Sequence, residues 1–247
     1  MIDGKNILVI GGATGIGKQI ALDFAQEGNN VAVADINILK VNQMIKENGL
    51  EANISAFEVD ASSWESVESL AQKVWAKLGK IQVLVYSAGI TKRLKFKEID
   101  WITWKRTMAV NLHGLFYSIK AMNPLIESGG SIVIIGSGSA ITGSGGGIHY
   151  ASSKGGAFGF MRSIVNDMGN NGININVVAP RVIESDMLDV LYPSVESKQQ
   201  LIQEIPIRRL GKPTDISSIV KYLCREDAHY IHGQVLLLDG GRTYTGK

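Results

Sequence analysis

Tyr150 and Lys154 are the side chains in this sequence whose types and spacing best fit acid–base chemistry. They are four residues apart, so they share one face if the segment is helical. A free phenol titrates near pH ~10, and a cation held beside it lowers its pKa by favouring the phenolate. We therefore expect Tyr150 to donate and accept a proton, with Lys154 lowering its pKa. Taken alone the pair is weak, because it also fits an amphipathic helix with a half-buried tyrosine.

Ser137 stands thirteen residues before Tyr150, at the end of the apolar run 132–135. A short run of this kind predicts a strand that is buried on both faces. A hydroxyl group at the carboxyl end of that strand can hydrogen-bond a substrate oxygen beside Tyr150. The glycine-rich segment 143–147 allows the two side chains to approach one pocket.

A glycine-rich turn near the amino end fits the phosphates of a dinucleotide. The apolar run 7–10 predicts a strand, Gly11, Gly15 and Gly17 follow it, and a helical pattern then continues to about Gly28. Glycine lets the backbone turn tightly and approach a pyrophosphate, while the helix amino terminus offers free N–H groups and a partial positive charge. Strand, glycine turn and helix in that order predict a dinucleotide site, although tight strand–helix turns also use glycine for other reasons.

Asp35 ends the second apolar run, twenty residues after Gly15. A carboxylate at that distance binds both hydroxyl groups of the adenosine ribose and repels a 2′-phosphate, so it predicts NAD rather than NADP. The alternative is that Asp35 only caps the amino terminus of the next helix.

Apolar runs of strand length alternate with helical patterns along the chain, which predicts a parallel sheet. We expect strands near 7–10, 31–34, 54–59, 81–86, 132–135, 173–180 and 234–238, and helices over 37–48, 63–78, 104–127 and 213–224. The predicted fold class is α/β, a Rossmann-type doubly wound parallel sheet of about seven strands in a single domain over 1–247. Asn111 lies inside the predicted helix 104–127, where asparagine is disfavoured, and indicates a distortion or a polar role.

Ligands of such sheets bind at the carboxyl ends of the strands. Six separate positions of chemical interest fall at these ends: Gly11, Asp35, Asp60, Gly89, Ser137 and Pro180. The polar segment 181–211 is the longest insert that we expect to be irregular, and we interpret it as a lid over the substrate.

Composition excludes several classes of protein. The net charge of +2 argues against nucleic acid as the main partner, and no apolar run is long enough to span a membrane. The single cysteine, Cys224, excludes an internal disulfide and fits a reducing, cytoplasmic location. His229 and His232 alone do not make a metal site, so we expect no metal.

In these motifs the chain resembles the short-chain dehydrogenase/reductase family over nearly its whole length. The matching residues are Gly11-x-x-x-Gly15-x-Gly17, Ala88-Gly89, Asn111, Ser137, Tyr150-x-x-x-Lys154 and Pro180. The resemblance implies a nicotinamide-dependent oxidoreductase with NAD as cofactor, a small alcohol or ketone as substrate, and a homotetramer. It implies that Tyr150 is the acid and base, Ser137 binds the substrate oxygen, Lys154 lowers the pKa of Tyr150 and binds the nicotinamide ribose, and Asn111 holds a proton-relaying water. The cofactor contacts that it implies are Gly11, Thr14, Gly15, Ile16, Gly17, Asp35, Asp60, Ala61, Ser87, Ala88, Gly89, Tyr150, Lys154, Pro180, Val182, Ile183 and Ser185.

The sequence departs from the family pattern at several positions. Ile10 precedes the first glycine where threonine is frequent, Tyr86-Ser87 replaces Asn-Asn, Arg181 replaces the glycine after the proline, and Ser185 replaces a threonine. Arg181 fits two roles: it closes over the cofactor pyrophosphate, or it meets a carboxylate or phosphate of the substrate. The cationic run Lys92–Lys97 gives the second role some further support.

The resemblance is strongest to the 3-oxoacyl-[acyl-carrier-protein] reductases, which dock an acidic carrier through basic residues and usually prefer NADPH. The corresponding segments here, 127–130 and 169–172, contain no lysine or arginine. We therefore favour a sugar, polyol or hydroxy acid as substrate, with a carrier-protein reductase as the alternative. A regulator that binds NAD without catalysis is a further alternative, disfavoured by the intact Ser, Tyr, Lys and Asn set.

Overall fold

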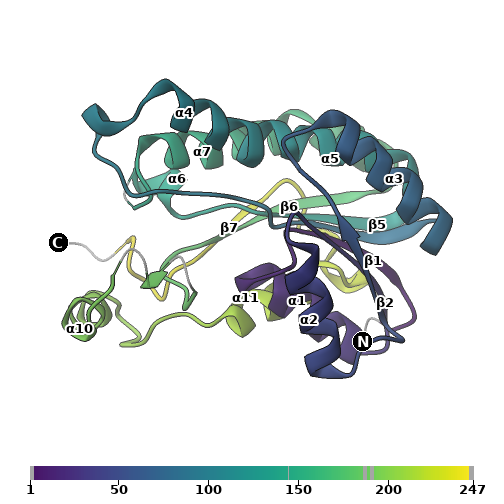
Figure 1. Ribbon diagram of the computed structural model, residues 1–247, viewed down its shortest axis with the longest axis horizontal. Helices are drawn as coiled ribbons and strands as arrows, with labels where there is room; N and C mark the ends of the chain where they lie inside the picture. The colour runs from purple at the N-terminus through teal and green to yellow at the C-terminus, as the bar shows by residue number, and fades with distance from the viewer. Residues whose placement is uncertain (1–2, 144, 186–187, 190–191, 245–247) are drawn as a thin grey trace.

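Parallel strands form the central layer of the molecule (Figure 1). The structure is a computed structural model that describes residues 3–143, 145–185, 188–189 and 192–244. The strands in this part are β1 Asn6–Ile10, β2 Asn30–Asp35, β3 Ile54–Glu58, β4 Ile81–Tyr86, β5 Ile126–Ile135, β6 Asn174–Pro180 and β7 Val235–Leu238. They form one sheet in the order β3-β2-β1-β4-β5-β6-β7, with every neighbouring pair parallel. The strand order reverses between β1 and β4, which leaves a crevice at their carboxyl ends.

Helices cover both faces of the sheet, as expected for a doubly wound fold. The α-helices in the described part are α1 Gly15–Gln26, α2 Ile38–Asn48, α3 Trp64–Leu78, α4 Trp101–Met108, α5 Gly114–Met122, α6 Ser139–Thr142, α7 Ile148–Ser163, α8 Val165–Asn170, α10 Val195–Gln203 and α11 Pro213–Leu223. In Figure 1, α3, α4, α5 and α7 lie on one side of the sheet, and α1, α2 and α11 on the other. No helix in the described ranges is both long and apolar enough to cross a membrane.

Side chains that alternate along each strand supply two separate cores. Leu8 and Val9 are neighbours in β1, and both are fully buried. Val9 packs with Ile20 and Ile216 in the cluster under α1 and α11, while Leu8 packs with Leu115 in the cluster under α3, α5 and α7. Burial on both faces is why these strands are continuous apolar runs rather than alternating ones.

Local capping explains where two of the predicted helices begin. The Asn37 side chain accepts a hydrogen bond from Lys40 N at 3.1 Å and caps α2, and Ser63 caps α3 by accepting from Ser66 N at 3.2 Å. Asp35 is therefore not the cap of α2, and this alternative reading of its role is wrong.

The single helix predicted over 104–127 is wrong, because the segment is interrupted. After α4 the backbone widens into a π-helical turn, Ala109–His113, before α5 begins, and β5 already starts at Ile126. The buried Tyr86 hydroxyl donates to the carbonyl of Val110, within this turn, at 2.5 Å. A side chain inserted into the backbone ladder is a recognised cause of such a distortion. The distortion that Asn111 indicated is confirmed.

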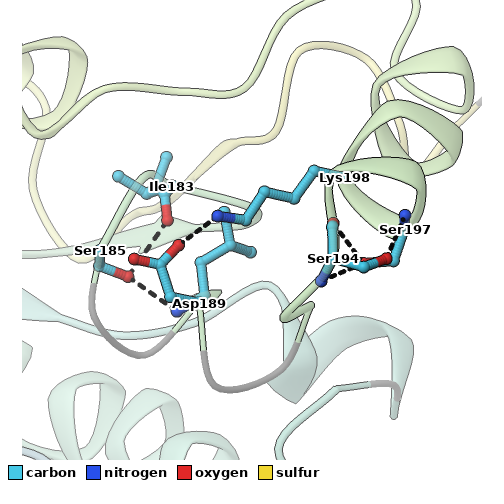
Figure 2. A network of polar contacts seen from close by, with 7 residues as sticks. Ile183, Ser185, Asp189, Ser194, Ser197 and Lys198 are labelled. Carbon is cyan, nitrogen blue, oxygen red and sulfur yellow. Dashed lines mark hydrogen bonds and ion pairs between the residues drawn. The ribbon is translucent and has the colours of Figure 1, made fainter.

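The expectation of an irregular segment over 181–211 is also wrong in part. Helix α10 lies inside it, and Ile183 pairs with Gly211 in an isolated bridge that joins its two ends. Figure 2 shows the polar contacts of this region, including an ion pair of 2.5 Å between Lys198 of α10 and Asp189. Its role as a lid stays a prediction.

Candidate active site

A cleft with a volume of about 930 Å³ lies at the carboxyl ends of the strands. It is lined by most of the residues predicted from sequence: Gly11, Thr14, Gly15, Ile16, Asp35, Asp60, Ala61, Ser87, Ala88, Gly89, Ser137, Tyr150, Lys154, Pro180, Val182, Ile183 and Ser185. Gly17 and Asn111 are not among the lining residues. The carboxyl-end rule therefore brings residues from all along the chain into one site.

The glycine turn at one end of the cleft is built for close backbone approach. Gly11 has φ of +84°, and a Cβ there would clash with the backbone of Ala88. Gly17 does not face the cleft; a Cβ on it would clash with the carbonyl of Gly11, so this glycine lets α1 pack on the turn. Gly15 has φ of +55° and nothing within 4 Å of its Cβ position. A ligand can thus approach the backbone where α1 begins.

The amino terminus of α1 suits an anionic group. Thr14 precedes the helix, its side chain makes no capping bond, and the first turn contains no acidic residue. The N–H groups there remain available, and the helix dipole adds a partial positive charge. These features fit the pyrophosphate of a dinucleotide.

Asp35 lies at the end of β2 with its carboxylate held by the backbone. Ala13 N donates to Oδ2 and Asn37 N donates to Oδ1, each at 3.0 Å. These two bonds orient the carboxylate between the glycine turn and the start of α2. The next lining residue, Ile36, is 65% exposed and offers no cation for a phosphate.

Ser137, Tyr150 and Lys154 meet at the opposite end of the cleft. Ser137 and Tyr150 both line this end, and the Ser137 side chain is close enough to act on the pKa of the Tyr150 phenol. Lys154 is 4% exposed, and its Nζ donates to the carbonyl of Ile135 at 2.9 Å. The Nζ atom also lies 5.9 Å from the centroid of the Tyr150 ring, so the predicted shared helical face is confirmed.

The electrostatics differ from the sequence-based expectation. Burial raises the pKa of Tyr150 above its ordinary value, and the Ser137 side chain acts in the other direction. Burial likewise lowers the pKa of Lys154 to about 8. The net direction is thus opposite to the expected lowering of the Tyr150 pKa by Lys154. The reason is that both groups are removed from water, which favours their neutral forms.

Known proteins resemble this chain over nearly all of its length. Residues 11–243 match a family model described as enoyl-(acyl carrier protein) reductase. The 3-oxoacyl-[acyl-carrier-protein] reductase FabG of Thermotoga maritima is 33% identical, with 97% of this chain and 98% of the relative covered. The chain belongs to the short-chain dehydrogenase/reductase family. Members of this family use a nicotinamide cofactor, and the glycine turn with its open helix terminus fits one.

The names of further relatives of this short-chain dehydrogenase/reductase refer to different substrates. The 7alpha-hydroxysteroid dehydrogenase of Escherichia coli is 34% identical, covering 97% of this chain and 94% of the relative. A crystal structure from Brucella melitensis, titled as a short-chain dehydrogenase/reductase of the glucose/ribitol dehydrogenase type, has a TM-score of 0.94. It is 28% identical and covers 99% of this chain and 98% of that one. The relatives thus confirm the family and the fold, and they leave the substrate open.

The Asn111 side chain holds neighbouring segments together through hydrogen bonds. It accepts from Ile90 N at 2.8 Å and donates to Ile90 O at 3.0 Å and to Ser153 Oγ at 3.0 Å. These bonds tie the π-helical turn to the loop after Gly89 and to α7. They occupy both ends of the amide, so its side chain acts on the site by positioning the loop; the expected proton-relaying water stays a prediction.

Two further predicted contacts are engaged in local structure. The Ser185 hydroxyl donates to Ile183 O and accepts from Leu188 N, both at 3.2 Å, as Figure 2 shows for the first of these partners. Asp60 is exposed and accepts from the backbone and side chain of Ser62. Each still lines the cleft.

Sequence reasoning missed several residues that line this cleft or support it from behind. Tyr86 is the buried side chain that holds the π-helical turn, and its signal was its replacement of the usual asparagine. Gly146 has φ of +70°, and a Cβ there would lie 2.5 Å from Cδ1 of Tyr150. Arg106 and Arg242 also line the cleft, but neither belongs to a motif that the sequence reveals.

Gly146→Ala is expected to lower turnover on the order of a hundredfold, because the added methyl group displaces the Tyr150 ring and the backbone there is left-handed. Initial rates of formation of the reduced nicotinamide cofactor, with an alcohol that the wild type oxidises, measure the effect. Gly159→Ala is the matched control, since nothing lies within 4 Å of its Cβ position. Equal activity of the two variants would contradict the role assigned to Gly146.

Proposed function

We propose that this chain is an NAD-dependent oxidoreductase that interconverts a secondary alcohol and a ketone on a small polar substrate of the sugar, polyol or hydroxy acid type. The observation that carries the proposal is that Ser137, Tyr150 and Lys154 line the same cleft as the glycine turn and Asp35. Family membership supports the reaction class.

The residues divide the chemistry between them. Ser137 and Tyr150 bind the substrate oxygen, and Tyr150 takes the hydroxyl proton as the carbinol hydrogen leaves with its electron pair. A bound oxidised nicotinamide would supply the hydride acceptor and a positive charge, which would favour the phenolate that burial alone disfavours. Lys154, with a pKa of about 8, can pass a proton at working pH. In ketone reduction the same proton returns from Tyr150.

The preference for NAD rests on Asp35. Its carboxylate is fixed by two backbone N–H groups in the position expected for the adenosine ribose, and the neighbouring Ile36 supplies no positive charge. A 2′-phosphate there would meet a negative charge without a compensating cation.

A 3-oxoacyl-[acyl-carrier-protein] reductase is the second candidate, because FabG relatives are 33% identical over 97% of the chain. Against it, 127–130 and 169–172 carry no lysine or arginine to attract an acidic carrier. They lie together, with Gly129 N donating to Gly172 O at 2.8 Å, at the amino ends of β5 and β6 and away from the cleft.

We extend the proposal to a homotetramer in the cytoplasm. Phe116 of α5 is 47% exposed and packs edge-on against Phe160 of α7, which gives this helical face aromatic surface suited to a second copy. The free, buried Cys224 suits a reducing compartment. Sedimentation equilibrium is expected to give about four times the mass of the chain, 26.7 kDa; a monomer would contradict the tetramer.

Tyr150→Phe is expected to lower the rate by roughly two to four orders of magnitude while leaving NADH affinity unchanged, because it removes the proton donor and keeps the ring. Steady-state rates and NADH fluorescence titration measure the two quantities. Tyr222→Phe, at an exposed tyrosine of α11, is the control. Turnover near that of the wild type in Tyr150→Phe would reject the mechanism.

Asp35→Ala is expected to shift the ratio of the NADPH and NADH dissociation constants towards NADPH by at least roughly tenfold, because it removes the repulsion of the 2′-phosphate. Asp35→Asn removes the negative charge but keeps one oxygen that can accept a backbone hydrogen bond. Comparing it with Asp35→Ala therefore separates the effect of the lost charge from that of a disturbed turn. Both ratios come from fluorescence titration. Tighter binding of NADPH than NADH by the unmutated protein would overturn the cofactor assignment.

A further inference from the structure

The charged side chains of the cleft are sorted by sign along its length. Among the described lining residues, the acidic ones are Asp35 and Asp60, both at the adenosine end. The cations are Lys154, Arg93, Arg106, Arg181 and Arg242. Four guanidinium groups in one cleft raise its positive potential and attract anions.

Arg181 is held beside the reacting groups by its backbone and its stem. Its N–H donates to Leu238 O of β7 at 2.9 Å. A Cβ on Gly138, the residue after Ser137, would lie 2.9 Å from Cβ and 3.2 Å from Cδ of Arg181, so the arginine stem crosses that glycine. The next residue, Val182, has φ of +64°, a left-handed conformation that is costly for a β-branched side chain. Such strain persists only where the surrounding structure fixes the backbone.

Arg93 reaches the cleft from a different loop. Of the cationic run over Lys92–Lys97, it alone lines the cleft. Its guanidinium lies 5.8 Å from the ring centroid of Tyr192, which is also a lining residue. The Thr91 hydroxyl donates to Gly146 O at 2.9 Å and so fastens this loop to the glycine segment against Tyr150.

Acidic residues outside the cleft balance part of the positive charge of these arginines. Arg242 forms an ion pair with Glu204, and Arg181 Nη1 donates to the Thr243 hydroxyl at 2.9 Å. Burial and the charge of Arg242 lower the pKa of Arg181, while Asp239 acts in the opposite direction. Neither Glu204 nor Asp239 lines this cleft. The anionic partners therefore orient the guanidinium groups from outside the cavity.

We propose that the substrate carries an anionic group, a carboxylate or a phosphate, which Arg181 binds together with Arg93 while Ser137 and Tyr150 hold the reacting oxygen. A planar guanidinium matches either oxyanion with two parallel hydrogen bonds. This inference deepens the proposed function and rests on it. Among the three substrate types named above it selects hydroxy acids and sugar or polyol phosphates over neutral sugars and polyols.

The test uses the full-length protein saturated with NADH and titrated calorimetrically with malonate, inorganic phosphate and neutral malonamide. Saturable binding of malonate or phosphate, with malonamide at least tenfold weaker, is expected. The tighter of the two anions identifies the carboxylate or the phosphate. Affinity should fall as salt is added, since the contact is between charges.

Arg181→Ala is expected to weaken binding of the preferred anion by roughly ten- to a hundredfold, which is the loss typical of hydrogen bonds to a charged group. Arg181→Lys keeps the positive charge but loses the two parallel N–H donors of the guanidinium. Its anion affinity should therefore fall between that of Arg181→Ala and that of the wild type. Arg93→Ala tests the second guanidinium and replaces Arg181→Ala if that variant does not fold. Arg162→Ala, at an exposed arginine near the end of α7 and outside the cleft, should bind like the wild type.

Three results would overturn the inference: no saturable anion binding, equal anion affinity in Arg181→Ala and Arg162→Ala, or a loss in Arg181→Ala that falls on NADH itself. The last result would assign Arg181 to the cofactor pyrophosphate. Turnover of neutral alcohols without anion binding leaves the proposed redox function standing and removes this inference. Anion binding without turnover of acidic or neutral alcohols would reject the proposed redox function and leave only the anion-binding site standing.

Discussion

The burial of the Lys154 ammonium group is the interaction on which the rest of the site depends. Its Nζ donates to Ile135 O at the end of β5, and a Cβ on Gly89, beyond the end of β4, would lie 3.2 Å from it. Removing such a charge from water costs several kcal/mol unless polar partners surround it. The strand ends, the π-helical turn and α7 together supply those surroundings, so the lysine can be kept only in the complete fold.

Several local features help to accommodate the buried Lys154 ammonium group. Glycine at position 89 leaves room for the ammonium, and Asn111 fixes the following residue, Ile90, by two hydrogen bonds. Asn111 can do so because the backbone widens into a π-helical turn, which Tyr86 stabilises through Val110 O. A side chain that inserts into the helical ladder in this way is a recognised cause of a widened turn. The neutral side chain of Tyr86 thus connects the sheet to the site.

The two ends of the cleft follow different physical rules. At the end proposed for the adenosine, glycines, backbone N–H groups and one carboxylate are placed to recognise a ligand through shape and backbone contacts. At the catalytic end, arginine side chains from the end of β6, the loop after β4 and the C-terminal segment converge. The first set belongs to a local strand–turn–helix unit. The second comes from segments far apart in the chain, so it can differ between relatives that share the fold.

Sequence alone determined the layered architecture, because strand and helix periodicity and glycine turns are properties of neighbouring residues. It also placed Tyr150 and Lys154 on one helical face and brought the strand ends Gly11, Asp35 and Ser137 to one edge. Boundaries failed where long-range contacts decide them, as in the segment 104–127, whose interruption depends on a tyrosine from another strand.

Only the tertiary structure decided the directions of the pKa shifts and which arginines besides Arg181 reach the cleft. Burial depends on every element that packs around a group, and it outweighs the effect expected of Lys154 on the pKa of Tyr150. The same holds for Arg93, which the sequence shows only as one cation in a run. A one-dimensional pattern records the spacing of side chains along the chain, whereas desolvation and charge act through space.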